Sequence, residues 1–281
     1  MRLALAGTLL FSASLTTPGE TSKPDPTQTP RFSTLEAAMG NALATQVRRH
    51  TTALEAPSAQ AYVESVGQRL SAQMPNAGPV DWSFTIIKPS ASGGPTHEPI
   101  SAPGGFIFVP AGLLLTVGNE AEFAGMLAHA MAHVVEKHGT KTVVSQGNTT
   151  IFALCWPGSA TVLREFPSVS FGCLQFLREY ELAADQFAAK AMAATGYSPN
   201  ALLTYLRRTQ PEDSPADQKF SALPPRTLRL SQLEQAIATV PAAAATLAPA
   251  TNLAALQEEI RSALAKTDTT QSIPSLLHPR K

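Results

Sequence analysis

The sequence HAMAH at residues 129–133 places two histidines four residues apart, within an apolar stretch that predicts a helix. Side chains four residues apart on a helix project from the same face, one turn apart. That geometry suits the binding of one metal ion by His129 and His133. On a later predicted helix, Glu181 would complete a His2Glu zinc site that keeps a fourth position open. Asp185, one turn after Glu181, is a candidate to orient a ligand imidazole.

Helix and strand signals surround this histidine pair. Asn119 is predicted to cap a helix over residues 120–138, and Gly139 is predicted to end it. Periodic apolar residues predict further helices within 32–74, over 174–194, from about 200 onwards and over 228–237. Alternating residues predict two strands, at 82–87 and 105–109. We therefore expect an α+β fold, rich in helix and with a small β-sheet.

The chain divides into four predicted segments. Residues 1–18 carry one positive charge and then an apolar run of signal-peptide length, too short to span a bilayer. They are typical of an export signal, and the alternative is a buried N-terminal helix. Residues 19–32 form a Pro/Thr-rich linker, residues 33–238 the main domain, and residues 239–281 an Ala/Pro-rich tail with a short helix towards residue 266.

Composition excludes several functional classes. The 281 residues include 21 Lys plus Arg and 21 Asp plus Glu, so the net charge is zero, which disfavours nucleic acid as a partner. Two cysteines are too few for a disulfide framework or a cysteine-rich zinc ribbon. In an oxidising compartment Cys155 and Cys173 either pair or stay as two buried thiols. We expect no transmembrane span.

Several ordered motifs carry a family resemblance. The sequence LAHAMAHVVEKH at residues 127–138 resembles the L-A-H-E-x-x-H-x-x-x-x-H helix of the gluzincin metallopeptidase family that includes HtpX and the CAAX prenyl endopeptidases. The sequences PGGFIFV at 103–109, EFA at 122–124, ELAAD at 181–185 and GYSP at 196–199 are similar to other motifs of that family. The resemblance runs from about residue 59 to residue 233.

The resemblance implies a zincin-like peptidase domain over residues 33–238, one zinc ion per chain, and peptide or protein substrates. His129, His133 and Glu181 occupy the family's ligand positions. Metzincins place a glycine seven and a third histidine ten residues after the first histidine, where this chain has Glu136 and Gly139. A third ligand from elsewhere is therefore favoured, which again points to Glu181.

The chain departs from the family pattern at its most reactive position. In H-E-x-x-H proteases the glutamate is the general base that takes a proton from the attacking water, and here that position is Ala130. Loss of a positioned acid or base typically lowers the rate by ~10²–10⁴. We therefore predict a metal site with strongly impaired peptidase activity. Glu136 is a weak candidate for a substitute base, since it is expected to point past the metal.

Two further positions bear on the cleft and on the helix. In the segment SALPPRTLRL at 221–230, Leu223 stands where the family has histidine, and Arg229 matches a family arginine that either approaches the cleft or is an ordinary surface residue. An engineered inactive form is another explanation of Ala130, but the second replacement at Leu223 favours a natural loss. By helical periodicity His138 faces away from the pair and is expected to be packed or hydrogen-bonded.

These observations support a metalloendopeptidase-family protein of the cell envelope, periplasmic if bacterial, that is inactive or weakly active. The alternative is a non-catalytic pseudopeptidase that binds peptides or partner proteins through an edge strand at residues 106–109. A third reading, a helical protein whose histidine pair is only part of the core, requires all the motif matches to be coincidental. Such a protein would hold no stoichiometric zinc.

Overall fold

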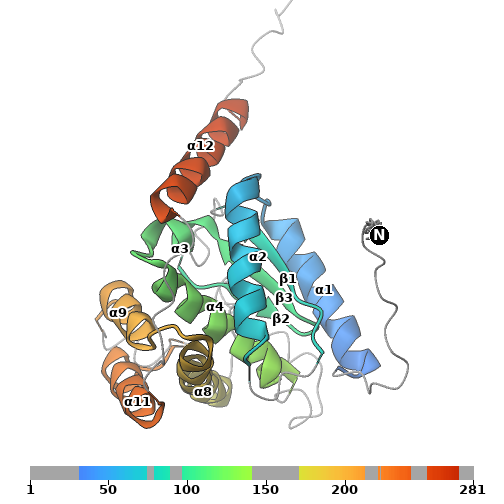
Figure 1. The fold of residues 1–281 in the computed structure, drawn as a ribbon. Coiled ribbons are helices and arrows are strands. Elements are labelled where there is room, and N and C mark those ends of the chain that lie inside the picture. Colours follow the sequence, from blue (N-terminus) through green and yellow to red (C-terminus); the bar gives the residue numbers. More distant parts are fainter. Residues whose placement is uncertain are drawn as a thin grey trace, which may run out of the picture. The chain divides into compact units, whose positions relative to one another are not determined.

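The computed structural model describes residues 32–74, 79–88, 97–140, 171–212, 221, 223–241 and 252–271. The predicted signal peptide, almost all of the predicted linker, Cys155 and the side chain of Cys173 lie outside the described residues. The described residues all belong to one compact unit, Arg31–Lys281. Figure 1 shows its helices and its small sheet.

Three strands form the sheet, in the order β1-β3-β2. β3 (Phe106–Pro110) is parallel to β1 (Ser83–Ile87) and antiparallel to β2 (Ile100–Ala102). The two predicted strands are confirmed as β1 and β3, whereas β2 was not predicted because three residues are too few to show alternation. The expectation of an edge strand at residues 106–109 is wrong, because β2 folds back beside β3 and makes β3 the central strand.

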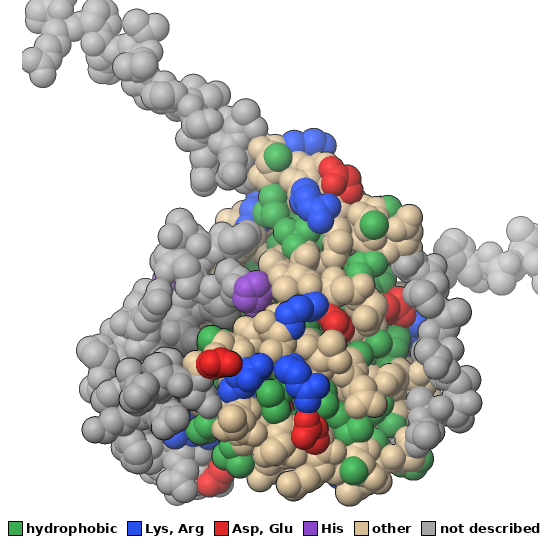
Figure 2. All heavy atoms as spheres, turned by 90° about the vertical axis from the view of Figure 1, so that its left-hand side faces the viewer, with side chains coloured by type: hydrophobic (Ala, Val, Ile, Leu, Met, Phe, Trp, Pro, Cys, Tyr) green, Lys and Arg blue, Asp and Glu red, His purple; other side chains and the backbone are tan. Residues whose placement is uncertain are grey.

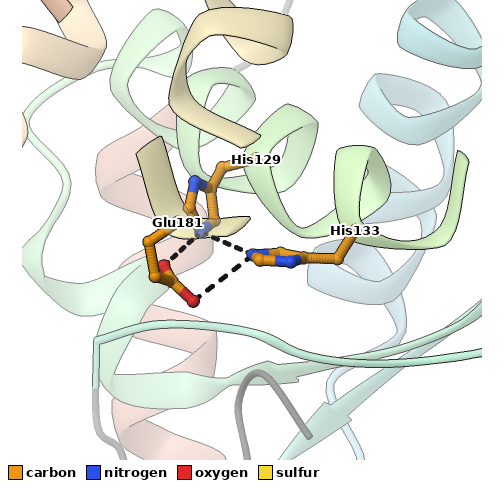
Figure 3. A group of neighbouring side chains, drawn as sticks. All are labelled: His129, His133 and Glu181. Carbon is orange, nitrogen blue, oxygen red and sulfur yellow. Dashed lines mark hydrogen bonds and ion pairs between the residues drawn. The ribbon is translucent and has the colours of Figure 1, made fainter. Parts of the chain in front are cut away.

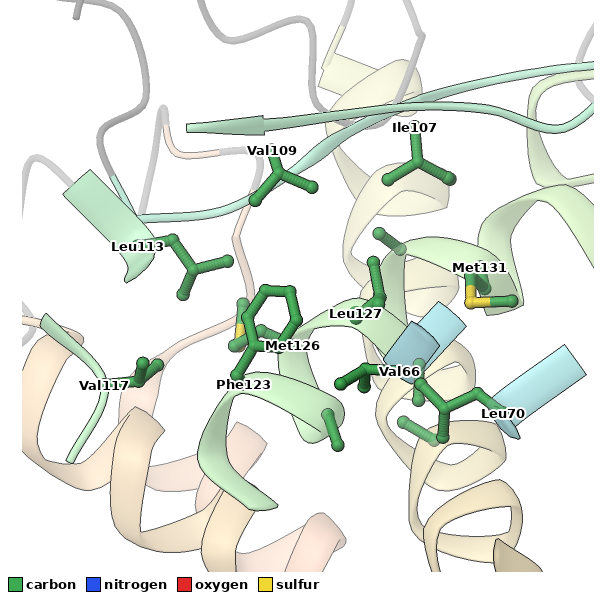
Figure 4. Packing of buried hydrophobic residues seen from close by; sticks show 14 of the residues in the cluster. Val66, Leu70, Ile107, Val109, Leu113, Val117, Phe123, Met126, Leu127 and Met131 are labelled. Atoms are coloured by element: carbon green, nitrogen blue, oxygen red, sulfur yellow. The ribbon is translucent and has the colours of Figure 1, made fainter. Parts of the chain in front are cut away.

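The two faces of the sheet pack against different helices because side chains alternate along a strand. On one face, Ile107 and Val109 join the main core with α2 (Pro57–Ser71) and α4 (Glu120–Val135), as Figure 4 shows. On the other face, Phe108 packs with Ala44 of α1 (Thr34–His50). The helical stretch predicted within 32–74 is thus two helices, one for each face.

The central helix α4 is buried on nearly all sides. Its N-cap is Asn119 as predicted, with the side chain accepting a hydrogen bond from Glu122 N at 2.9 Å. The helix ends at Val135, three residues before the predicted end, because the backbone of Lys137 takes a φ of 55°, outside the range of right-handed helix. A new helical stretch begins at residue 138, so Gly139 does not stop α4.

Helices α8 (Phe171–Thr195) and α9 (Asn200–Thr209) pack against α4, α11 (Arg226–Thr239) packs on both of them, and together they place the second half of the site. Their predicted counterparts at 174–194, from 200 and at 228–237 are confirmed. With the three-stranded sheet, these helices confirm the helix-rich α+β fold class.

One helix was not predicted from the sequence, and another is longer than predicted. The short α3 (Ala111–Thr116) follows β3 directly, and α12 (Leu253–Gln271) is a 19-residue helix where a short one was expected. α12 packs on α2 and α3. Among the described residues, no helix is long and apolar enough to cross a membrane. Figure 2 shows one face of the molecule, on which acidic, basic and apolar side chains are interspersed.

Candidate metal centre

Helices α4 and α8 bring His129, His133 and Glu181 together, as the sequence predicted (Figure 3). One potential ligand atom from each residue lies within 4.8 Å of the others, and all three side chains are buried. His129 Nε2 is 3.2 Å from His133 Nε2 and 3.1 Å from Glu181 Oε2. His133 Nε2 is 3.5 Å from Glu181 Oε1. Two ring nitrogens and one carboxylate therefore face a common point.

The chemistry of this donor set fits a metal ion. Glu181 Oε2 is buried and has no hydrogen-bond donor of good geometry among the described residues, although His129 Nε2 lies 3.1 Å away. A buried carboxylate oxygen without a donor costs free energy that a cation would offset. Two imidazoles and one carboxylate, with a further position open, form the ligand set of catalytic zinc sites. The residues present thus fit the metal that the sequence implied.

Asp185 lies behind His129 and holds its ring. Asp185 Oδ1 is 2.8 Å from His129 Nδ1, so the other ring nitrogen, Nε2, faces His133 and Glu181. Asp185 also accepts two hydrogen bonds from Arg229, from Nε at 2.7 Å and from Nη2 at 3.1 Å. The structure therefore brings Asp185 to the ring of His129, one of the two histidines that the sequence predicted as ligands.

The charges of this group shift several pKa values. Burial alone would raise the pKa of Asp185, but Arg229 and His129 lower it to about 2. Burial lowers the pKa of His129, and the carboxylates of Asp185 and Glu181 outweigh it and raise the pKa to about 10. Burial and the neighbouring positive charges hold the pKa of His133 well below its usual value.

Arg229 is completely buried, so the alternative of an ordinary surface residue is wrong, and its guanidinium lies close to the cluster. Besides Asp185 it donates from Nη1 to Glu98 Oε1 at 3.1 Å, and its Nη2 lies 3.8 Å from Glu181 Oε2. Its guanidinium is therefore shared among three carboxylates. Glu98 was missed by sequence reasoning, because it lies just before β2 in a segment without periodicity or motif.

The position of the family's general base is occupied by a buried methyl group, since Ala130 is 1% exposed. Glu136 is the C-cap residue of α4 and is half-buried. Leu223 lies just before α11, in a segment that Arg178 of α8 holds by two hydrogen bonds to Ser221 O. Among the described residues, the group of potential metal ligands does not include Glu136.

His138 lies beside His133, not on the far side of the helix. Its Nδ1 is 3.1 Å from His133 Nδ1, and its ring stacks on Tyr180 with centroids 4.5 Å apart. The expected placement fails because α4 ends at Val135 and the following turn carries His138 back towards the site. Helical periodicity could not reveal this contact, since it holds only while the helix continues.

Comparisons with known proteins extend this description. The chain is 23% identical over 206 residues to the putative beta-barrel assembly-enhancing protease of Vibrio cholerae, and 23% identical over 210 residues to the beta-barrel assembly-enhancing protease of Escherichia coli. Each match covers 69% of this chain and 40% of the relative. The mitochondrial metalloendopeptidase OMA1 of Schizosaccharomyces pombe is 27% identical over 150 residues, 52% of this chain and 43% of OMA1.

The chain thus spans about two fifths of the length of the curated relatives it matches. A crystal structure of S. mikatae Ste24p aligns with a TM-score of 0.42 and 17% identity, covering 71% of this chain and 55% of Ste24p. The model of peptidase family M48 matches residues 57–237, a range that holds both histidines, Glu181 and Arg229. Since this match spans more than half of the sequence, the chain belongs to peptidase family M48, a family of metallopeptidases.

Proposed function

We propose that this chain binds one zinc ion through His129, His133 and Glu181, and that Ala130 leaves its peptide-cleaving activity strongly impaired. The observation that carries the proposal is the convergence of three buried ligand atoms within 4.8 Å, together with the buried alanine at position 130, which follows His129 directly in the sequence. Family membership supports peptide or protein substrates, as do the names of the relatives, which are proteases.

Each residue of the site has a distinct part in this proposal. When bound, zinc supplies a Lewis acid that polarises the carbonyl of the scissile peptide bond. His129 and His133 would hold it by ring nitrogens, with the metal taking the place of a proton on His129, and Glu181 would hold it by a carboxylate oxygen. Asp185 orients the ring of His129, and the buried Arg229 fixes Asp185. Arg229 thus acts as a positioning residue.

At position 130 the described site offers no group that accepts a proton from the attacking water and passes it to the leaving amine. The methyl group of Ala130 can do neither, and loss of such a group typically lowers the rate by ~10²–10⁴. Binding of a peptide does not need this group. Ala130 therefore also favours a second candidate function, in which the chain holds peptides or partner proteins without cutting them.

We also propose that the chain is exported and works in the cell envelope. The support is the charged start and apolar core of residues 1–18, which are typical of a signal peptide. In this proposal residues 33–238 form the peptidase domain, with a linker before it and the tail of residues 239–281 after it.

The test measures zinc content and casein hydrolysis for the protein as it is, for Ala130→Glu and for Ala130→Gln. The glutamine variant is the matched control, because it has the size of glutamate without its basicity. We expect one zinc per chain in all three proteins and cleavage only by Ala130→Glu. Chelator-sensitive cleavage by the unmodified protein would contradict the proposed impairment, and Glu136→Gln would then show whether Glu136 supplies the base.

A control for the ligands uses the histidines. His133→Ala is expected to abolish stoichiometric zinc, whereas His50→Ala, on the exposed last turn of α1, is expected to leave it unchanged. If neither the unmodified protein nor Ala130→Glu retains zinc after dialysis against a zinc buffer, the proposed metal site is wrong.

A further inference from the structure

The two ligand histidines are held from behind by different partners. His129 Nδ1 faces the carboxylate of Asp185, whereas His133 Nδ1 faces the ring nitrogen of His138. We propose that His138 is a positioning residue that fixes the ring of His133 for metal binding, and that α1 holds His138 in place through Glu36. This inference rests on the proposed metal site. It adds a set of supporting contacts, of which Glu36 lies outside the family match of residues 57–237.

Because two facing ring nitrogens share one hydrogen, one ring is the donor and the other the acceptor of the hydrogen bond between them. His133 Nδ1 and His138 Nδ1 are 3.1 Å apart, so one of the two nitrogens donates and the other accepts. His133 Nε2 is the atom that faces Glu181 and must keep its lone pair to bind a metal. In the proposed metal site the hydrogen of His133 would therefore sit on Nδ1, with His138 Nδ1 as its acceptor. This tautomer is the one that a metal ligand needs.

His138 is itself fixed from the second ligand-bearing helix. Its ring lies nearly parallel to that of Tyr180, at an interplanar angle of 11°. Tyr180 precedes Glu181 on α8, so the stacked pair connects the turn after α4 with the backbone that carries the third ligand. His138 is 2% exposed, and the hydrogen bond to His133 is therefore shielded from water.

The turn that carries His138 is held by α1. Lys137 has a φ of 55°, a conformation that a residue with a side chain adopts only at a cost in free energy. Glu36 on α1 accepts hydrogen bonds from Lys137 Nζ at 3.2 Å and from Thr140 Oγ1 at 3.0 Å. Lys137 and Thr140 lie on either side of His138 in the sequence. Their hydrogen bonds to Glu36 secure the turn in the shape that brings His138 to His133.

Two substitutions separate the hydrogen bond from the packing. His138→Phe keeps a ring to stack on Tyr180 but removes the acceptor, whereas His138→Asn keeps an acceptor close to the position of Nδ1 but removes the stacking. Zinc affinity is measured by competition with a chromophoric chelator. We expect His138→Phe to bind zinc about 10–100-fold more weakly and His138→Asn to stay within about tenfold of the unmodified protein. His50→Phe, an exposed histidine on α1, is the control and should bind normally.

A second readout needs no metal. The nitrogen chemical shifts of His133 in the zinc-free protein report which ring nitrogen carries hydrogen. We expect Nδ1–H in the unmodified protein and in His138→Asn, and a shift towards Nε2–H in His138→Phe. An unchanged tautomer and unchanged affinity in His138→Phe would overturn the inference, as would equal losses in both variants.

The contribution of α1 has its own test. Glu36→Ala should weaken zinc binding, but less than His138→Phe does, because the stacking on Tyr180 remains. Binding as tight as in the unmodified protein would overturn the part assigned to α1. A failure of the proposed function is distinguishable from all these outcomes, since the unmodified protein would then bind no zinc at all.

Discussion

Asp185 is the carboxylate that pairs with the buried guanidinium of Arg229 and contacts the ring of His129. It is 1% exposed and forms ion pairs with Arg229 and, when that ring is protonated, with His129. Asp185→Asn would leave the fully buried Arg229 without its main counter-charge, and breaking a buried pair in this way costs ~3–5 kcal/mol. We therefore expect a loss of about 3 kcal/mol in the free energy of unfolding, together with weaker zinc binding. Urea denaturation measures the first and chelator competition the second.

The matched control is an exposed ion pair. Arg207 and Glu234 are both about half-exposed, so Glu234→Gln should cost less than about 1 kcal/mol and leave zinc binding unchanged. Similar losses from Asp185→Asn and Glu234→Gln would contradict the importance assigned to the buried network.

Residue by residue, the sequence predicted those parts of the site that helical spacing controls. The positions of His129 and His133 follow from a four-residue interval, and Asp185 lies one turn beyond Glu181 for the same reason. Glu98 and the contact of His138 could not be predicted, because both depend on how a non-helical segment folds back. The burial of Arg229 is likewise a result of packing between α8 and α11, which a local pattern does not encode.

At the scale of elements, α1 and the turn after α4 are joined by the carboxylate of Glu36, whose charge depends on pH. Burial raises the pKa of Glu36, but Ser33 N–H, Lys137 and Thr140 together lower it below its usual 4.5. A carboxylate with a lowered pKa stabilises the fold above the pKa of the unfolded chain, and this contribution is lost as the pH falls through the folded pKa. The link between α1 and the turn should therefore weaken in acid.

Glu36→Gln tests this link without changing the size of the side chain. We expect it to lower the free energy of unfolding at pH 7 by about 0.5–1 kcal/mol, since a charge near a helix N-terminus and a partly exposed ion pair are lost. At about pH 3 the unmodified protein and the variant should be equally stable. Denaturation curves at pH 7, 5, 4 and 3 measure the difference.

The control for the pH series is Glu258→Gln on α12, where the carboxylate is 71% exposed. It should change the free energy of unfolding by less than about 0.5 kcal/mol at every pH. A difference between Glu36→Gln and the unmodified protein that stays constant down to pH 3 would show that the charge of Glu36 contributes nothing to the link.

Element boundaries also show where prediction from sequence ends. The strong periodicity of 174–194 and 228–237 gave α8 and α11 within three residues at each end, because each helix buries one regular face. The end of α4 and the strand β2 were missed. Both depend on tertiary contacts, the first with Glu36 and the second with β3.

At the scale of the molecule, α12 joins the C-terminal part of the chain to elements near its beginning. Helix α2 lacks a side-chain cap at Ala56, and Glu259 of α12 supplies one by accepting hydrogen bonds from Ser58 N and Ala59 N, each at 3.1 Å. Gln257 donates to the carbonyl oxygens of Leu114 and Val117 at the end of α3. Although α12 lies outside the family match, it completes the termini of two helices within it.

If α12 is part of the cooperative unit, damage to its buried face must weaken the whole domain. Ile260 is 0% exposed and joins the main core, so Ile260→Ala should lower the free energy of unfolding by ~2–5 kcal/mol. Urea transitions followed by far-UV circular dichroism and by tryptophan fluorescence should shift together and stay coincident, because a single domain unfolds as one unit. The control is Leu228→Ala, at a leucine that is 42% exposed. It should change the free energy of unfolding by less than about 0.5 kcal/mol in both measurements. An early loss of helical signal in Ile260→Ala, with the fluorescence transition left in place, would instead show that α12 melts by itself.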